Sequence, residues 1–497
     1  MKILLVDAPF YRLQGSTPST VYPLGLAYIT SYLKNEGHDS LYLNLDGDMS
    51  IPFLNPLSAS AIKAEYENYL QEVSDASNHR IWQDYIEVLR IFRPDVVGIS
   101  IPSVKAKSVF KLLKITKSVA SRIYTVVGGH HSQVYAKDML ENDKNLDFVI
   151  RDEGEITMAE LARQLENPAS FRPESILGLV YRDSSGNIKV NERRQFIEDL
   201  DKLPWPSFCY YKKGDELIPH PKTAIMASRG CPYDCNYCAT NNMWARRVRM
   251  RSPDNVIKEI KHTIASQKGR FLTFCDDCFT LNKKWLVELC DIIIKDKIRI
   301  NWDCITSINL LDETIFRKIV EAGCVKVNVA IESGSQRILR IVNKNIDFDI
   351  VRKLFPIFRK YKISTAVYVM VGFPTETEYD IRLTQGIIQE LRPNRVYCSV
   401  LLPLPGTVCY EQCIARGLLD LTNAWRGDSI KSTVMNLTTT LTDEEFYRLA
   451  DETFDICYKI NTNMFNLMRC VPVMSYLKNP SSLFFDAIRM AQYLKKR

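Results

Sequence analysis

Six short apolar runs follow one another between residues 220 and about 410, and most of them are separated by a stretch with helical periodicity. The runs are Thr223–Ala227, Phe271–Phe274, Trp302–Ile305, Val325–Ile331, Thr365–Val371 and Arg395–Leu402. The helical patterns are Pro253–Ala265, Lys284–Lys295, Glu313–Ala322 and Ile350–Tyr361. This repeat predicts a partial (β/α)6 barrel, and barrel chemistry takes place at the carboxyl ends of the strands.

Three cysteines follow the first predicted barrel strand in a C-x-x-x-C-x-x-C pattern, at Cys231, Cys235 and Cys238. Three thiolates on one short loop can hold three irons of a four-iron cluster and leave the fourth iron open for a small ligand. A structural zinc site is the alternative, and it normally takes four protein ligands. Its fourth ligand would come from Cys275 or Cys278, which flank a pair of aspartates.

The first 170 residues also alternate between predicted strands and helices, but their pattern differs from that of the barrel. Apolar strands are predicted at 2–6, 40–45, 95–101, 122–127 and 146–150. Helical stretches between and after them predict a doubly wound parallel sheet, whose ligands bind at the carboxyl ends of the strands. The candidate ligand contacts there are Ser100, Ser103, Gly128 and Gly129. The adjacent glycines would let a bulky ligand approach the backbone.

The length of 497 residues fits two or three domains. We predict an α/β doubly wound domain at 1–170, a hairpin and linker at 171–219, the partial barrel at 220–410 and a helical C-terminal region at 411–497. The hairpin is indicated by two short apolar runs around a turn of the type Asp-Ser-Ser-Gly-Asn.

The composition argues against several classes of protein. Hydrophobic residues make up 46% and charged residues 25%, and a net charge of +7 is spread thinly, so we expect no nucleic-acid partner. We also expect neither a signal peptide nor a membrane span. All 14 cysteines lie at or beyond Cys209, which favours a metal site in a reducing cytoplasm over a secreted disulfide framework.

Two further stretches have more than one interpretation. The basic cluster at 246–251 follows the cysteine loop and can either bind an anionic part of a cofactor or form a solvated face. A C-terminal helix is predicted from a capping box at Thr442 and Glu445 to about Met468. The tail at 482–496 is amphipathic and basic, so it can pack on the barrel mouth or make peripheral contact with a membrane surface.

These patterns together resemble the radical S-adenosylmethionine (SAM) enzymes that carry a cobalamin-binding domain. The cysteine loop, with Tyr237 before its last cysteine, is similar to the radical SAM signature. The first domain is similar to the cobalamin-binding domain of this family at 22–26, 97–100, 127–130 and 151–155. In the last of these segments, relatives usually have a glycine where this chain has Asp152. The resemblance spans about residues 1 to 410.

The resemblance implies three cofactors, namely a [4Fe-4S] cluster on the three cysteines, SAM on the open iron, and cobalamin on the first domain. The barrel residues implied to contact cofactors are Asp276, Asp277, Glu332, Ser333 and Gly372. The family holds cobalamin without a histidine ligand to cobalt, although His130 and His131 follow the glycine pair here and keep that alternative open. An electron donor such as flavodoxin or ferredoxin and a small-molecule substrate are the implied partners.

The implied reaction uses the 5′-deoxyadenosyl radical from SAM to remove hydrogen from an unreactive carbon, to which cobalamin then supplies a methyl group. We therefore expect a methyltransferase acting on an unactivated carbon of a small metabolite or biosynthetic intermediate. A radical cyclisation, ring formation or rearrangement without methyl transfer is the alternative. A methylthiotransferase is not indicated, because the first domain has no cysteines for a further cluster. A cofactor carrier or sensor would leave the residues at the barrel strand ends unexplained.

Overall fold

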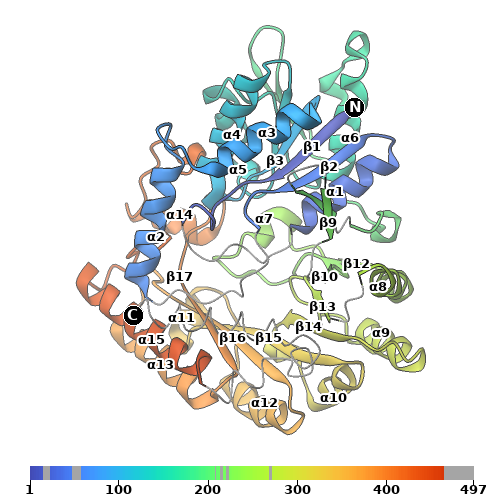
Figure 1. Ribbon diagram of the computed structural model, residues 1–497. Coiled ribbons are helices and arrows are strands. Elements are labelled where there is room, and N and C mark those ends of the chain that lie inside the picture. Colours follow the sequence, from blue (N-terminus) through green and yellow to red (C-terminus); the bar gives the residue numbers. More distant parts are fainter. Residues whose placement is uncertain are drawn as a thin grey trace.

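The computed structural model of the chain contains two main β-sheets, which lie one above the other in Figure 1. The structure describes residues 1–14, 23–47, 58–206, 209–212, 216–219, 223–267, 271–431 and 433–463. The amphipathic tail predicted at 482–496, with its possible membrane contact, lies outside these residues. Among the helices that the structure describes, none is both long enough and apolar enough to cross a membrane.

The N-terminal sheet is doubly wound, as the sequence predicts. Its strands are β1 (Lys2–Asp7), β2 (Asp39–Asn44), β3 (Val96–Ser100), β4 (Tyr124–Gly128), β5 (Phe148–Ile150), β6 (Leu179–Arg182), β7 (Ile188–Val190), β8 (Cys209–Lys212) and β9 (Glu216–Pro219). Its helices are α1 (Leu24–Asn35), α2 (Ala59–Glu72), α3 (Arg80–Phe92), α4 (Ala106–Val119), α5 (Ser132–Asn142) and α6 (Gly154–Leu165). The strand order is β7-β6-β5-β4-β3-β1-β2-β8-β9, with parallel pairing from β5 through β8.

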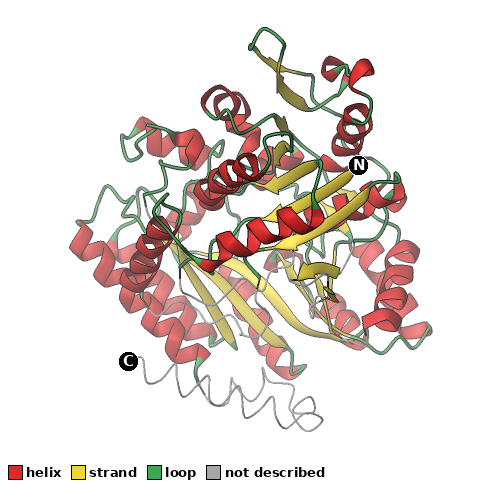
Figure 2. Ribbon diagram, turned by 45° about the horizontal axis from the view of Figure 1, so that its top comes forward, coloured by secondary structure: helices red, strands yellow, loops and turns green. Residues whose placement is uncertain are grey.

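Helices cover both faces of this sheet (Figure 2). Leu4 and Val97 pack on one face in a cluster that includes residues of α3, α4 and α5. Ile3 and Val96 pack on the other face with residues of α1 and α6. Burial on both faces explains why these strands are continuous apolar runs rather than alternating ones.

The segment 171–219, predicted as a hairpin and linker, contributes four strands to this sheet. The predicted hairpin is present as β6 and β7, which pair antiparallel. Strands β8 and β9 were not predicted, because Pro204 and Pro206 resemble a stiff linker and strands of four residues are too short to show a clear alternation. The domain boundaries given above therefore remain predictions.

The second sheet is the predicted partial barrel. Its strands are β10 (Thr223–Ile225), β13 (Phe271–Phe274), β14 (Asn301–Thr306), β15 (Cys324–Glu332), β16 (Ser364–Val371) and β17 (Arg395–Val400). They pair in parallel in this order. The helices are α8 (Pro253–Gln267), α9 (Lys283–Lys295), α10 (Glu313–Glu321), α11 (Gln336–Ile341), α12 (Phe348–Lys360) and α13 (Glu378–Leu391). All strands of a parallel sheet end on one side, so the predicted site residues are brought to one edge.

In the described part of the chain after the barrel, the α-helices are α14 (Val408–Ala415) and α15 (Asp443–Asn461). The capping box that predicts the start of α15 is present, because the Thr442 and Glu445 side chains each accept a hydrogen bond from the other's backbone amide. The helix ends at Asn461, earlier than the predicted Met468. Phe446 and Leu449 of α15 belong to the barrel core, so this helix covers the outside of the last strands.

Candidate functional site

The three cysteines lie on a loop that follows β11 (Ser228–Arg229) and leads into α7 (Thr240–Trp244). β11 pairs antiparallel with β12 (Arg249–Met250), so a short ribbon closes the base of this cluster loop. The loop begins just past the carboxyl end of β10, where barrel chemistry is expected. In Figure 1, α7 lies between the two sheets.

The backbone of the cluster loop is fixed at both ends. Gly230 has a φ of 101°, and a Cβ atom there would overlap the carbonyl oxygen of Arg247, so the turn requires glycine. Farther along, the Asn236 amide donates to the Val342 carbonyl at 3.0 Å. The Cys409 amide in turn donates to the Asn236 carbonyl at 3.0 Å. These bonds connect the loop to α11 and α14, and so hold the cysteines in place.

The three thiols are partly to fully shielded from water. Cys235 is buried, and Cys231 and Cys238 are half-buried. Burial raises the pKa of Cys231 to about 12, and the neighbouring thiols of Cys278 and Cys238 add to the shift. Burial also raises the pKa of Cys235, while the ammonium group of Lys344 acts in the opposite direction. Such thiols give up their protons when a cation binds.

These residues fit a four-iron cluster. The thiols are close enough to influence one another's pKa, and each would bind a different iron, so they need not converge on one point. Within the described ranges, no group of three His, Cys, Asp or Glu side chains is arranged to hold a single metal ion. The assignment of Cys231, Cys235 and Cys238 as cluster ligands stays a proposal.

The aspartate pair after β13 holds the base of the cluster loop. The Ser228 hydroxyl donates to Asp276 Oδ1 at 2.5 Å, and the Ala227 amide donates to Asp276 Oδ2 at 3.2 Å. Asp277 Oδ2 accepts a bond from the Gly230 amide at 3.2 Å. Burial raises the pKa of Asp276 to about 7. Both oxygens of Asp276 are thus engaged within the protein, whereas the exposed Asp277 side chain remains the better candidate for a SAM contact.

Glu332 lies at the end of β15, in contact with the cluster loop. Its carboxylate accepts a hydrogen bond from the Tyr237 hydroxyl at 2.9 Å and is 3.5 Å from Lys344 Nζ. Burial raises the pKa of Glu332, and Lys344 opposes that shift. Its φ of 70° is unusual for a non-glycine residue, and such strain is found mainly at functional sites. The neighbouring Ser333 is buried, and its hydroxyl accepts a bond from the Ser335 amide at 3.1 Å.

Gly372 follows β16 in a left-handed turn, with a φ of 94°. Its amide donates to Glu376 Oε2 at 2.6 Å, and a Cβ atom at this position would come within 3.2 Å of the Phe446 ring. The ring of Phe373 contacts that of Tyr237 edge to face at 6.1 Å. This turn therefore lies beside the cluster loop and the Glu332 carboxylate. Contact of Gly372 with SAM remains a prediction.

In the first domain, the predicted cobalamin contacts lie at the ends of β3 and β4. Gly129 has a φ of 126°, and a Cβ atom there would be 3.3 Å from the Ile101 amide nitrogen. Gly128 and Ser100 are half-buried. Backbone without side chains at the end of a doubly wound strand fits a bulky ligand. These residues fit cobalamin, and their contact with it stays a proposal.

Ser103 and His131 are engaged with each other. The Ser103 hydroxyl is 3.0 Å from His131 Nδ1, and His131 Nε2 donates to the Trp425 carbonyl at 2.7 Å. Burial lowers the pKa of His131 to about 4, so the ring is neutral at pH 7. With both ring nitrogens bonded within the protein, His131 is not poised to bind cobalt. The His130 side chain is exposed and stays the candidate for that alternative.

The strand ends of the two sheets face each other. Trp425, which lies in the 3₁₀ turn Ala424–Arg426 after the barrel, contacts His131 of the first domain. The Tyr135 and Tyr410 hydroxyls are hydrogen-bonded at 2.7 Å. Cofactors bound at the two sets of strand ends would therefore be neighbours.

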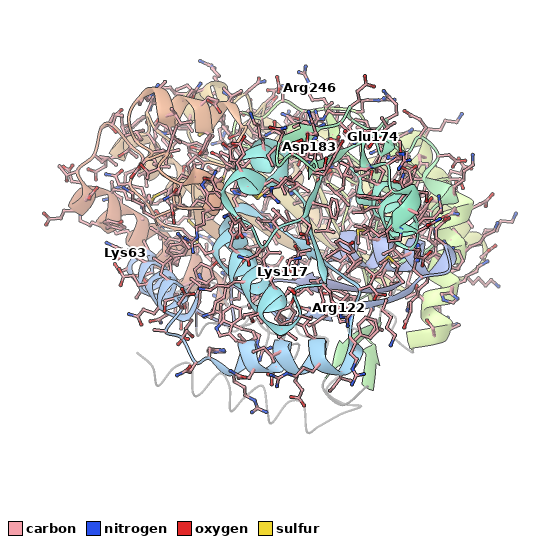
Figure 3. All side chains as sticks on the ribbon, turned by 90° about the horizontal axis from the view of Figure 1, so that it is seen from above. Lys63, Lys117, Arg122, Glu174, Asp183 and Arg246 are labelled. Carbon is pink, nitrogen blue, oxygen red and sulfur yellow. The ribbon has the colours of Figure 1, made fainter. Side chains whose placement is uncertain are left out.

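The basic cluster at 246–251 fits neither of its predicted roles as a whole. Arg249 and Arg251 are buried rather than solvated, and they pair with Glu153 and Glu259 rather than leaving charge for an anion. Arg246 projects at the edge of the molecule in Figure 3 and pairs with Asp234 at 3.1 Å. The sequence pattern could not show the pairing of Arg249, because Glu153 lies in a distant segment of the chain.

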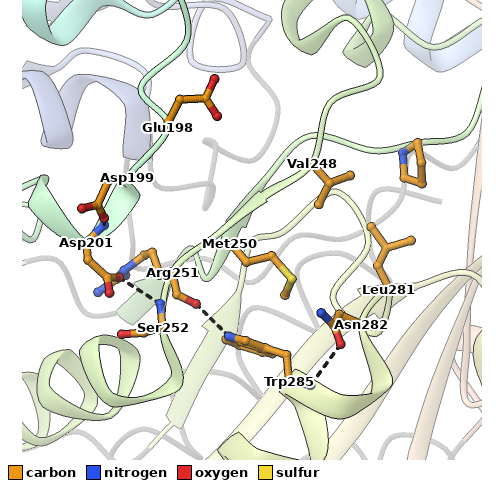
Figure 4. Close-up of a pocket in the computed structure, with 11 residues that line it drawn as sticks. Glu198, Asp199, Asp201, Val248, Met250, Arg251, Ser252, Leu281, Asn282 and Trp285 are labelled. Carbon is orange, nitrogen blue, oxygen red and sulfur yellow. Dashed lines mark hydrogen bonds between the residues drawn. The ribbon is translucent and has the colours of Figure 1, made fainter.

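A pocket of about 880 Å³ lies beside the cluster loop (Figure 4). Its wall includes Met250, Leu281 and Trp285, and it meets the cluster loop at Pro232. Several polar groups of the wall bond to one another; the Trp285 indole, for example, donates to the Arg251 carbonyl at 2.7 Å. The pocket contains none of the three cysteines, so it is adjacent to the candidate site rather than part of it.

Comparisons with known proteins agree with this geometry. Residues 225–385 match the Radical SAM superfamily, and residues 13–162 match the B12 binding domain. The radical SAM methyltransferase TsrM from Kitasatospora setae, solved with tryptophan substrate and a SAM analogue, has a TM-score of 0.62 at 18% identity. The likeness covers 83% of this chain and 76% of TsrM, and it shows a shared fold.

Three relatives are similar in sequence over most of the chain. An uncharacterized methyltransferase of Pyrococcus horikoshii is 28% identical over 453 residues, 88% of each chain. The cytidylyl-2-hydroxyethylphosphonate methyltransferase of Streptomyces wedmorensis is 24% identical over 489 residues, 90% of this chain and 88% of its own. The anaerobic magnesium-protoporphyrin IX monomethyl ester cyclase of Rubrivivax gelatinosus is 24% identical over 351 residues, 68% of this chain and 62% of its own.

The barrel, the cysteine loop and the matched superfamily make this chain a radical SAM enzyme. With its N-terminal B12 binding domain, it belongs to the family of radical SAM enzymes that contain a cobalamin-binding domain. The fold class and the cofactors predicted from the sequence, a [4Fe-4S] cluster, SAM and cobalamin, are confirmed.

Proposed function

We propose that the protein is a methyltransferase that adds a methyl group from SAM to an unactivated carbon of a small metabolite or biosynthetic intermediate. The observation that carries this proposal is the full-length similarity to relatives named methyltransferases, at 88% and 90% coverage of this chain. The meeting of the two sets of strand ends supports it, because methyl transfer needs a methyl carrier next to the radical source.

When bound, the cluster with SAM supplies a radical and cobalamin supplies a methyl group. The chain's own residues bind, orient and shield. We propose that Cys231, Cys235 and Cys238 hold the cluster, while Asp277 and Glu332 bind polar groups of SAM. The burial of Glu332 and its neighbours keeps water from this region. We propose that the substrate enters from the concave face of the barrel, between the two sets of strand ends.

Ring formation or rearrangement without methyl transfer is the second candidate, and the similarity to the Rubrivivax gelatinosus cyclase favours it. Either reaction needs single electrons, so we propose an electron donor of the flavodoxin or ferredoxin kind as a partner. We place the protein in the cytoplasm, because exposed and half-buried cysteines such as Cys275 and Cys231 persist as thiols in a reducing compartment.

The test uses SAM labelled in its methyl group, supplied with candidate substrates to the reconstituted enzyme. Methyl transfer predicts label in the product, with S-adenosylhomocysteine and 5′-deoxyadenosine formed in similar amounts. Product and 5′-deoxyadenosine without S-adenosylhomocysteine or transferred label would decide for the ring-forming alternative.

A further inference from the structure

The base of the cluster loop is attached to the first domain by a buried network of charges. We infer that Glu153 and Glu155 are positioning residues, which act through Arg229 and Arg249 to hold the cluster loop at a fixed place relative to the cobalamin-binding domain. The inference rests on the geometry of this network and on the two cofactors of the family, and it holds whether or not a methyl group is transferred.

The network joins three short elements through direct bonds. Arg229 Nη1 lies 2.5 Å from Glu153 Oε1, and Arg229 Nη2 lies 2.6 Å from Glu155 Oε1. Arg249 Nη1 lies 2.8 Å from Glu153 Oε2. The two glutamates lie at the start of α6, and the two arginines lie on the paired strands β11 and β12. All four side chains are at most 4% exposed.

Aromatic rings enclose the two guanidinium groups. Arg229 lies over the Tyr28 ring at 5.2 Å and is 6.0 Å from the Trp244 ring. Arg249 lies over Phe196 at 4.7 Å and is 5.3 Å from Trp244. Tyr28 belongs to α1 of the first domain, whereas Trp244 belongs to α7 beside the cluster loop. Each guanidinium group therefore contacts a carboxylate of the first domain and the Trp244 ring beside the cluster loop.

The type of contact determines what the network can do. A guanidinium fork that bonds two carboxylates fixes both the separation and the orientation of its partners. Two positive and two negative charges balance within the network, and none is screened by solvent, so displacement of one group leaves a buried charge without its partner. Displacement of one partner costs little free energy in a solvent-exposed ion pair, because water solvates the charge that is left, but it costs much more in this buried network.

The position of the network makes it relevant to the cofactors. Arg229 is two residues before Cys231, and the intervening Gly230 lies so close to Arg247 that a Cβ atom there would overlap the Arg247 carbonyl oxygen. A shift of α6 relative to the barrel is therefore passed to the first cluster cysteine. The segment that contains Glu153 and Glu155 also follows β5, on the sheet that provides the cobalamin-binding strand ends.

The test compares Glu155→Gln with Glu160→Gln in the full chain loaded with cluster and cobalamin. Glu155→Gln removes one negative charge of the network and keeps the size and shape of the side chain. Glu160 is the matched control, because it lies on the same helix and pairs with Arg194. The readouts are the magnetic dipolar coupling between cob(II)alamin and the reduced cluster, and amide hydrogen exchange in residues 228–238.

We expect both variants to bind iron and cobalamin as the wild type does. In Glu155→Gln, the dipolar coupling should shift or broaden and amide exchange at 228–238 should increase at least tenfold, while Glu160→Gln stays unchanged. Coupling and exchange equal to wild type in Glu155→Gln would overturn the inference. Loss of both cofactors in Glu155→Gln would also overturn it, by assigning the network to folding. Arg229→Lys, which keeps the charge but not the fork, should reproduce the shifted coupling.

Discussion

At the scale of single residues, backbone conformation explains a departure from the family pattern. The family resemblance implies a glycine where this chain has Asp152, and Asp152 indeed adopts a left-handed φ of 61°. Aspartate is among the non-glycine residues that tolerate this region, and Arg193 pairs with its carboxylate at 2.8 Å. The exchange of glycine for aspartate is therefore compatible with the same local fold.

The left-handed backbone of Asp152 gives a prediction for two substitutions, both of which remove the ion pair with Arg193. Asp152→Gly relieves the backbone strain, whereas Asp152→Ala does not, so the glycine variant should be more stable by about 1 kcal/mol. The free energy of unfolding from denaturant titration under anaerobic conditions measures the difference. Equal stabilities, or a more stable alanine variant, would show that the left-handed conformation is not required.

The raised pKa of Glu376 predicts how the free energy of unfolding depends on pH. Burial raises its pKa to about 8, although the Gly372 and Phe373 amides act to lower it. The folded chain thus keeps a proton that the unfolded chain loses above its ordinary pKa of 4.5. The stabilisation is complete below that value and is lost as the pH rises through 8, by up to about 1.4 kcal/mol per pH unit.

Glu376→Gln removes this titration, so the stability of the variant relative to wild type should increase between pH 6 and pH 9. Denaturant titrations at several pH values measure this, with Glu378→Gln as the control, because Glu378 is exposed on the next helix. A relative stability that does not change with pH would contradict the raised pKa.

At the scale of elements, the periodic segments could be predicted and the side-chain partners could not. All six barrel strands were predicted within a few residues of their observed bounds, because each is an apolar run and most of the runs are separated by a helical pattern. Strands β8 and β9 were missed because they are short and because β8 pairs with β2, a distant part of the chain. For the same reason no pattern showed that Lys344 lies beside Glu332, or that Arg229 meets Glu153.

The base of the cluster loop gives a prediction at this scale. Asp276→Ala would leave the Ala227 amide and the Ser228 hydroxyl without their acceptor in a buried place, at a cost of about 1–3 kcal/mol for each group. Asp276→Asn keeps an acceptor and should cost less. Denaturant titration measures the free energy of unfolding, and iron content per chain measures whether the loop still binds the cluster. If both variants equal wild type in stability, the aspartate does not hold the loop.

At the scale of the whole molecule, two domains present their strand ends to each other, and the contacts between them determine which side chains can reach the cofactors. His131 is taken up by Ser103 and Trp425, so we predict no histidine ligand to cobalt from that residue. Paramagnetic resonance of the cob(II)alamin form should show no nitrogen splitting that depends on His131, so the spectra of wild type and His131→Ala should be alike. Splitting that disappears in His131→Ala would contradict this.

The central claim is that one loop of this chain holds the cluster that activates SAM. Its most direct measurement is iron and sulfide content, together with cleavage of SAM, in the anaerobically reconstituted chain and in the variant with Cys231, Cys235 and Cys238 all changed to alanine. The account predicts one four-iron cluster per wild-type chain, formation of 5′-deoxyadenosine from SAM, and the loss of both in the variant. Unchanged iron and sulfide in the variant would contradict it.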